Sequence, residues 1–249
     1  MSGALVQFRG QMQKMQDQYA QVLPAHMTMD RLERMVFNAV QAAQKNNGSN
    51  ALLEADRRSL LSSVMTAAVL GLEPDGVTGQ GYLVPFKGKV QFIVGYGGYV
   101  TLAYNSGILL EGRVVYEGDI FSYQYGDDPK VNHAPAQGEE ATKRGRLIAA
   151  YAVARSHHVP TTFHVTELDD ILRVRDQSLG YKAAKKYNKQ TVWDTDFPAM
   201  ARKTPLRWLG KNMPLNVQKA QALESAFDRG QNAYITPDNT VDDSVTIEG

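Results

Sequence analysis

Lysines alternate with aromatic residues over a short stretch of the C-terminal half, and this pattern has the clearest chemical meaning in the chain. The window GYKAAKKYNKQTVW interleaves Lys182, Lys185, Lys186 and Lys189 with Tyr181, Tyr187 and Trp193. Ammonium groups bind phosphates and aromatic rings stack on bases, so the window fits a single-stranded nucleic acid. A solvated surface loop is the other interpretation, but such a loop seldom carries three aromatic residues.

Charge is distributed unevenly around this window. The net charge of the chain is only +1, yet residues 143–219 carry fifteen Lys and Arg against six Asp and Glu. Residues 220–249 carry one basic residue against six acidic ones. A basic block of this kind indicates a polyanion site, because neutralising phosphates releases counterions. A solvated charged surface is an equally weighted alternative.

A second basic segment, DFPAMARKTPLRWLGKNMP, has helical periodicity. At 100° per residue, Lys203, Arg207 and Lys211 fall within about 80° of one another, opposite an apolar face. Arg202 projects on the apolar side, where an unpaired guanidinium is unfavourable. It is therefore expected to reach solvent, a carboxylate or a phosphate. Pro205 lies inside this helix, where a proline can kink the helix axis or be accommodated without a break.

The central stretch 71–106 predicts the elements that position these residues. Period-two alternation indicates two strands joined at Lys87-Gly88-Lys89, where the glycine permits a tight reversal. Gly95-Tyr96-Gly97-Gly98 follows the second strand and lets backbone approach a neighbour or a ligand closely. A short helix is expected after it. Gly71 is expected to cap the preceding helix.

Periodicity and turn residues predict the remaining elements. Helices are expected over 5–22, 28–45, 51–70 and 218–228, and further strands over 109–116, 120–125, 147–155 and 161–165. The strand 147–155 lacks alternation, which is typical of a strand covered on both faces. A mobile loop is expected over 127–144, and a capping box at Thr166-Glu167-Leu168-Asp169. The weakly apolar first helix is expected to need a partner.

The aromatic row Phe121, Tyr123 and Tyr125 lies on one face of a predicted strand. Such a row can stack on bases, but sheet core is the favoured interpretation. Taken together, the elements predict an α+β fold in which a small antiparallel β-sheet with a hairpin packs against helices.

Several kinds of chemistry have no counterpart in the sequence. There are no cysteines, so thiolate metal sites and cysteine nucleophiles are excluded. No GxxxxGK[ST] motif is present, no spacing completes a metal shell around the histidines, and no nucleophile has its base. We therefore expect a non-enzymatic protein without cofactor or metal. No apolar run approaches the roughly 20 residues that span a bilayer, which predicts a cytoplasmic protein with no membrane partner.

Five strings carry a family resemblance: GLEP, GYLVPF, VQFIVGYGG, LAYNSG and MARKTPLRWL. In this order and spacing, over about residues 23–215, they resemble the RecT family of phage and prophage single-strand annealing proteins. Pro205 and Trp208 depart from the family pattern, which usually has a non-proline residue at the first position and often a basic one at the second.

The resemblance implies the annealing-protein fold and self-assembly into rings or helical filaments on DNA. It also implies a bacterial host cytoplasm, and a role in phage recombination beside a 5'-to-3' exonuclease and the host single-strand-binding protein.

These observations predict an ATP-independent protein that binds single-stranded DNA and anneals it to a complementary strand. The alternative is a passive single-strand-binding protein; a nuclease and an oligomeric structural protein are less favoured.

The expected organisation is a helical segment for subunit contact at 1–48, a DNA-binding core at 49–215 and a helix with a flexible acidic tail at 216–249. The candidate DNA ligands are Lys182, Lys185, Lys186, Lys189, Arg202, Lys203, Arg207 and Lys211, with Lys87, Lys89 and Arg113 secondary, and Tyr96, Tyr99, Tyr187 and Trp193 for stacking or groove lining.

Overall fold

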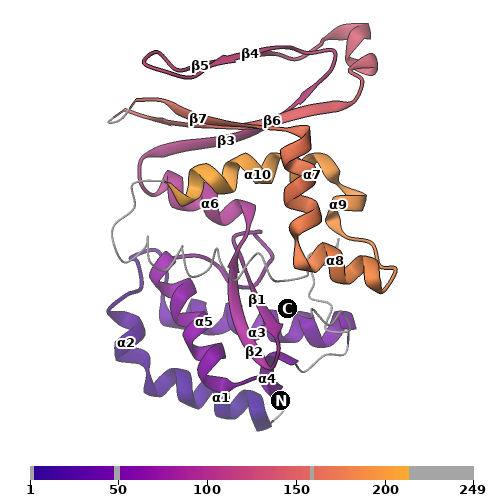
Figure 1. The fold of residues 1–249 in the computed structure, drawn as a ribbon. Helices are drawn as coiled ribbons and strands as arrows, with labels where there is room; N and C mark the ends of the chain where they lie inside the picture. The colour runs from indigo at the N-terminus through magenta and orange to yellow at the C-terminus, as the bar shows by residue number, and fades with distance from the viewer. Residues whose placement is uncertain (1–2, 48–50, 158–159, 213–249) are drawn as a thin grey trace.

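In the computed structural model, which describes residues 3–47, 51–157 and 160–212, a three-stranded antiparallel sheet lies between a β-hairpin and a layer of helices (Figure 1). The strands are β1 Gly81–Phe86, β2 Lys89–Val94, β3 Ile108–Tyr116, β4 Ile120–Gln124, β5 Lys130–Ala134, β6 Leu147–Ser156 and β7 Thr162–Glu167. The α-helices are α1 Gly3–Lys14, α2 Gln16–Ala20, α3 Met29–Asn47, α4 Ala51–Glu54, α5 Arg57–Leu70, α6 Tyr96–Tyr104, α7 Leu168–Gln177, α8 Leu179–Lys186, α9 Val192–Thr195 and α10 Phe197–Lys211. This arrangement confirms the predicted α+β class.

The central strand of the main sheet is β6, in the order β3-β6-β7. Residues from Ala149 to Ala154 are buried without interruption, because α10 packs on one face of the sheet and the β4–β5 hairpin lies over the other (Figure 1). The prediction of a strand covered on both faces is confirmed.

The β4–β5 hairpin corrects the expectation of a mobile loop over 127–144. Within that range lie β5, which pairs with β4, and a 3-10 helix, Gly138–Lys143. The aromatic row packs on the sheet, where Phe121 stacks on Tyr151 at 5.5 Å and Tyr125 on Phe163 at 4.9 Å between ring centroids. The core interpretation is correct only in part, because Tyr123 and Tyr125 remain 41% and 53% exposed. The strand escaped prediction because only two of its residues face the sheet.

A buried carboxylate fastens this hairpin. Asp119 has no exposed side-chain surface and accepts two hydrogen bonds from Arg144, at 2.8 and 2.6 Å. It also bonds His133 at 3.0 Å and accepts from the backbone N–H groups of Tyr116 and Ala136. The Arg144 guanidinium holds the pKa of Asp119 well below its usual range. The network joins the β3–β4 turn, β5 and the chain leading into β6.

The lower half contains α1 to α5 and the β1–β2 hairpin (Figure 1). The single helix predicted over 5–22 is wrong: α1 and α2 are separated at Met15. Its apolar residues nonetheless find a partner within the chain, because Phe8, Met12 and Tyr19 are buried in the largest core cluster.

The β1–β2 turn consists of Lys87 and Gly88, with φ of 48° and 74°. Both values lie in the left-handed region that a two-residue type I′ hairpin requires. The Gly88 carbonyl accepts from the Asp56 N–H at 2.8 Å, and Asp56 caps α5 by accepting from the Ser59 N–H at 2.9 Å. The hairpin tip is thereby fixed beside the start of α5, while Gly71 ends that helix with φ of 68°, as predicted.

The glycines after β2 serve contact within the chain. The N–H groups of Gly95 and Gly97 donate to the carbonyls of Gln80 and Gly79 at 2.9 and 3.1 Å. A Cβ atom on Gly95 would lie 2.1 Å from the Gly79 oxygen. Of the two predicted uses, close approach to a neighbour or to a ligand, the structure gives the neighbour: the loop before β1.

Candidate nucleic-acid interface

Helix α10 is positioned by its cap and by two glycines. The Asp196 carboxylate accepts from the Ala199 N–H at 3.1 Å, which begins the helix. A Cβ atom on Gly112 of β3 would lie 2.8 Å from Arg202 Cγ, and one on Gly210 would lie 2.4 Å from the Tyr99 ring. Glycine at both places lets α10 lie directly against the sheet on one side and α6 on another.

The faces of α10 follow the predicted periodicity. Ala201, Leu206 and Leu209 are buried, whereas Lys211 at the end of the helix is exposed. The helix continues through Pro205, whose ring is buried. Within Phe197–Lys211 there are four cations and neither Asp nor Glu, so a strongly positive element packs against the core.

Arg202 lies on the inner side of α10, where its guanidinium sits over the Tyr96 ring at 5.3 Å. Its Nε is buried and has no hydrogen-bond partner among the described residues. The Tyr96 side chain is partly open to solvent, at 36% exposure. Of the three expected partners, solvent, a carboxylate or a phosphate, the described residues supply none directly: Arg202 meets an aromatic face, which leaves donor capacity for an anion.

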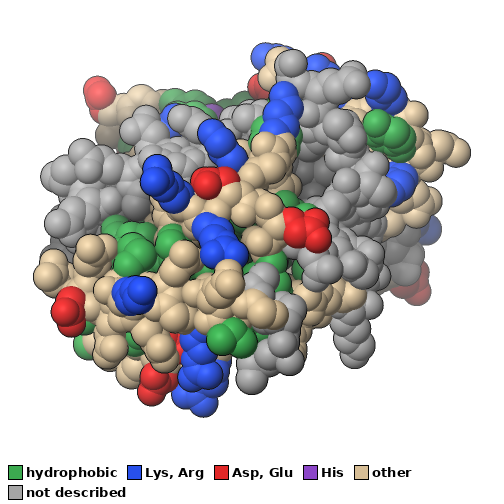
Figure 2. Space-filling view, turned by 90° about the horizontal axis from the view of Figure 1, so that it is seen from below, with side chains coloured by type: hydrophobic (Ala, Val, Ile, Leu, Met, Phe, Trp, Pro, Cys, Tyr) green, Lys and Arg blue, Asp and Glu red, His purple; other side chains and the backbone are tan. Residues whose placement is uncertain are grey.

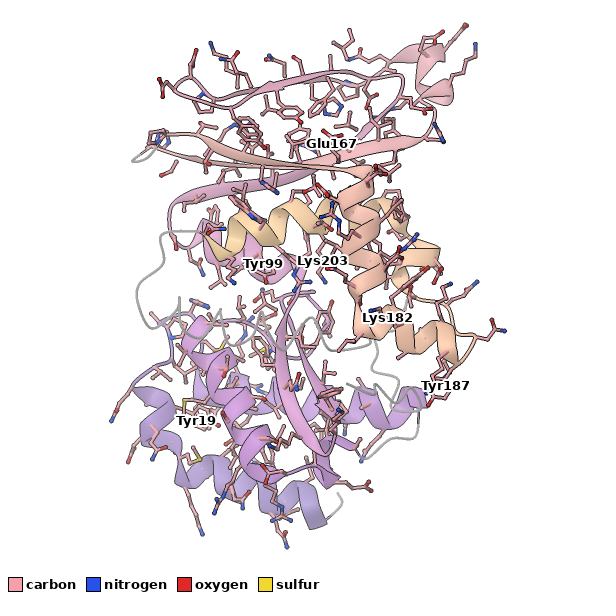
Figure 3. All side chains as sticks on the ribbon, in the orientation of Figure 1. Tyr19, Tyr99, Glu167, Lys182, Tyr187 and Lys203 are labelled. Atoms are coloured by element: carbon pink, nitrogen blue, oxygen red, sulfur yellow. The ribbon has the colours of Figure 1, made fainter. Side chains whose placement is uncertain are left out.

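Lys203 and Arg207 lie one turn apart beside Tyr99. Arg207 donates a hydrogen bond to the Tyr99 hydroxyl, whose pKa is raised by burial. Lys203 is half-buried, and burial, with a smaller effect of the Arg207 charge, lowers its pKa to about 8. No Asp or Glu in the described part of the chain pairs with Lys203. In Figure 3, Lys203 lies on the side of α10 that faces the lower half of the molecule.

The Lys/aromatic window forms α8 and α9 and lies to one side of this group (Figure 3). Lys182, Lys185 and Lys186 are exposed, and Lys189 is half-buried. Lys185 Nζ pairs with Asp194 at 2.7 Å and lies 5.1 Å from the centre of the Tyr181 ring. This pairing raises the pKa of Lys185. The window therefore offers solvated lysines on a helix, and one of them is already neutralised.

Two of the four predicted stacking residues belong to the core. Trp193 is 8% exposed and packs against Phe197, and Tyr99 is 1% exposed beneath Gly210. Neither ring has a face open to a base, so of the two predicted roles, stacking or groove lining, stacking does not fit their burial. Tyr187 and Tyr96 remain accessible, at 41% and 36% exposure.

The three secondary cations lie elsewhere. Lys87 and Lys89 are exposed at the hairpin tip, about 17 Å along the strands from the end that leads into α6. Arg113 lies on the face of β3 opposite to Gly112 and α10, and it pairs with Glu111 at 3.6 Å. The structure therefore does not bring these three together with the α10 group.

Arg57 and Arg58 extend the positive charge of the β1–β2 hairpin tip. These two arginines are not among the residues predicted from the sequence. They open α5, next to Asp56 and hence beside Gly88. The adjacent basic pair was visible in the sequence, but only the backbone contact reveals its neighbour. Figure 2, seen from below, shows Lys and Arg spread over the lower face with acidic side chains between them.

The described residues contain no cluster of three or more His, Asp or Glu suited to a metal ion. None of their helices has the length and apolar composition needed to cross a membrane.

In this α+β protein a cationic helix without Asp or Glu packs against a small antiparallel sheet, an arrangement that is typical of nucleic-acid-binding proteins. The RecT family model matches residues 33–239. Protein RecT of Escherichia coli (strain K12) is 34% identical over 233 residues, which cover 90% of this chain and 80% of that protein. The uncharacterized protein YqaK of Bacillus subtilis (strain 168) is 29% identical over 206 residues, covering 81% and 67%. The chain belongs to the RecT family, whose members act in DNA recombination and single-strand annealing.

Proposed function

We propose that the chain binds single-stranded DNA along α10, at Lys203 and Arg207 and at Arg202 on the adjoining inner side, and anneals it to a complementary strand without ATP. The observation that supports this most is the half-buried Lys203 ammonium, which no carboxylate of the described residues neutralises. Burying a charge without a partner is unfavourable. A phosphate at this place would remove that cost.

In the proposed mechanism the protein holds the sugar-phosphate backbone and leaves the base edges free. Lys and Arg contacts to phosphate carry no sequence information, so pairing with the second strand supplies the specificity. The lysines of α8 raise the local positive potential and extend the path of the strand beyond α10. Tyr96, held under Arg202, lines the path, and Tyr187 lies at its α8 end. This activity requires neither a catalytic residue nor a metal.

The proposal includes assembly and partners. Subunits form a ring or a helical filament on DNA, with residues 1–48 in subunit contact and 49–215 as the DNA-binding core. The proposed acidic tail, 216–249, and its short helix lie outside the described residues. The setting is the bacterial host cytoplasm, beside a 5'-to-3' exonuclease and the host single-strand-binding protein; the absence of cysteine accords with that reducing compartment.

Two complementary fluorescent oligonucleotides test the function directly. Mixed without ATP or magnesium, they should form duplex faster with the protein than without it. Binding without acceleration would make the protein a passive single-strand binder, and shortening of the strands on adding magnesium would make it a nuclease. A protein that leaves both oligonucleotides unbound would refute the proposal.

A further inference from the structure

The two tryptophans of the chain lie in opposite environments. Trp193 is 8% exposed, whereas Trp208, on α10, is 50% exposed. Indole side chains are highly buried on average, because their apolar area is large. Trp208 therefore presents a large aromatic surface to solvent on α10.

His164 holds this ring in place. It projects from β7 toward α10, and its imidazole stacks on the indole with centroids 4.1 Å apart and planes 10° from parallel. Because the imidazole covers one face, the exposed surface of Trp208 comprises the other face and the ring edge. Burial lowers the pKa of His164, against a smaller opposite effect of Asp170, which favours the neutral imidazole.

Positive charge lies next to this open face. Lys211 follows Trp208 by three residues and is exposed. Side chains spaced i and i+3 on a helix have Cβ atoms about 5–6 Å apart. Arg207 is the neighbour of Trp208 in sequence. Because α10 contains no Asp or Glu, the charges along this helix are all positive. A ligand lying on the indole therefore has cations within reach of its edge, which is the combination that a nucleotide of a single strand needs.

We infer that Trp208, backed by His164, stacks on a base of the bound single strand while Lys211 binds a neighbouring phosphate. This inference rests on the proposed function and adds a base contact to it. An apolar protein surface fits less well, because covering the ring would also desolvate the adjacent cations. The stacking has no sequence preference, since every base has a π-face.

Tryptophan emission tests this on the intact protein. Adding a homothymidine oligonucleotide should quench emission in the wild type. In Trp208→Phe, where only the buried Trp193 remains, the emission should not respond. The difference between the two titrations isolates Trp208 without altering the core.

Affinity provides the second readout. Trp208→Ala should weaken binding of the thymidine oligonucleotide by about fivefold to a hundredfold, since stacking contributes roughly 1–3 kcal/mol per base, and Trp208→Phe should retain most of the affinity. With an abasic oligonucleotide of the same length, wild type and Trp208→Ala should bind equally.

Three results would overturn the inference and leave the proposed function intact: unquenched emission on binding, equal affinity of Trp208→Ala for the thymidine strand, or an equal loss on the abasic strand. A change in sedimentation of Trp208→Ala without DNA, with unchanged affinity, would assign the ring to contact between copies. If the wild type binds no oligonucleotide, the proposed function itself fails.

Discussion

Helices α8 and α10 both present lysines, but the two sets differ in what surrounds them. On α8, Lys182, Lys185 and Lys186 are exposed, and Lys185 has a carboxylate partner in Asp194. On α10, Lys203 is half-buried with a pKa lowered to about 8 and no acidic partner in the described part of the chain. Solvated lysines cost the fold little, whereas a desolvated and unpaired one destabilises it.

This difference indicates function better than the density of charge does. The α8 window has the more conspicuous composition, yet three of its lysines are exposed and Lys185 has a carboxylate partner. On α10, Lys203 and the Nε of Arg202 lack partners among the described residues, and burying such polar groups unpaired is unfavourable. Strain of this kind is expected where a ligand completes the site.

Removing two charges from each helix gives the largest contrast. Lys203→Ala with Arg207→Ala should weaken single-strand binding by at least about a hundredfold, because hydrogen bonds to charged groups contribute roughly 1.5–3 kcal/mol each. The salt slope of the affinity should fall by about 1.4, at about 0.7 per phosphate contact. Lys182→Ala with Lys186→Ala, the matched change in charge, should alter both quantities less than half as much. Fluorescence anisotropy at several salt concentrations measures both, and equal losses would remove the distinction between the helices.

The pH dependence of single-strand binding should also distinguish Lys203 of α10 from the exposed lysines of α8. A phosphate beside Lys203 raises its pKa from about 8, so binding takes up a proton when the free ammonium has lost one. Affinity should therefore fall about tenfold between pH 7 and pH 9. In Lys203→Arg, which stays charged over this range, the fall should disappear. A wild-type affinity that is flat over these two units would contradict the role given to Lys203.

As the pH rises, the free energy of unfolding should increase, whereas the affinity for single-stranded DNA should decrease. The folded-state pKa of Lys203 is below its unfolded value of 10.5, so the unfolded chain holds this proton more tightly and the free energy of unfolding rises with pH from about 8 toward 10.5. At pH 7, Lys203→Met should raise that free energy by about 1 kcal/mol, since an unpaired charge is replaced by an apolar chain. Lys182→Met should leave the urea midpoint unchanged. A lower midpoint for Lys203→Met would show that the ammonium supports the fold.

The smallest effect is expected at Lys185. Asp194 already neutralises it, and exposed ion pairs contribute little. Lys185→Ala should change single-strand affinity by no more than about twofold. A loss comparable to that of the α10 double variant would place the strand on α8 instead.

Local rules were sufficient for much of the fold. The Lys87-Gly88 turn, the Gly71 cap and the apolar face of α10 each depend on residues close in sequence, and each was predicted. The position of the capping box was predicted wrongly. Strand β7 continues to Glu167, so no capping box forms at the start of α7. Thr191 and Asp194 form a capping box at the start of α9 instead.

Tertiary contacts could not be predicted in this way. Burial of Trp193 and Tyr99 depends on α10 packing over them, and composition alone does not distinguish such rings from exposed Tyr187. The distance between Lys87 and α10 follows from the direction of the hairpin. The lack of a partner for Lys203 is likewise a property of its neighbours in space, although the 100° periodicity did place it beside Arg207.

The Lys203 side-chain ammonium can be followed by NMR with and without a single-stranded oligonucleotide. Its pKa should be about 8 in the free protein and should move up toward 10.5 when the strand is bound, because a phosphate then neutralises the charge. A pKa that stays at its free value at saturating oligonucleotide would contradict the assignment of the strand to α10.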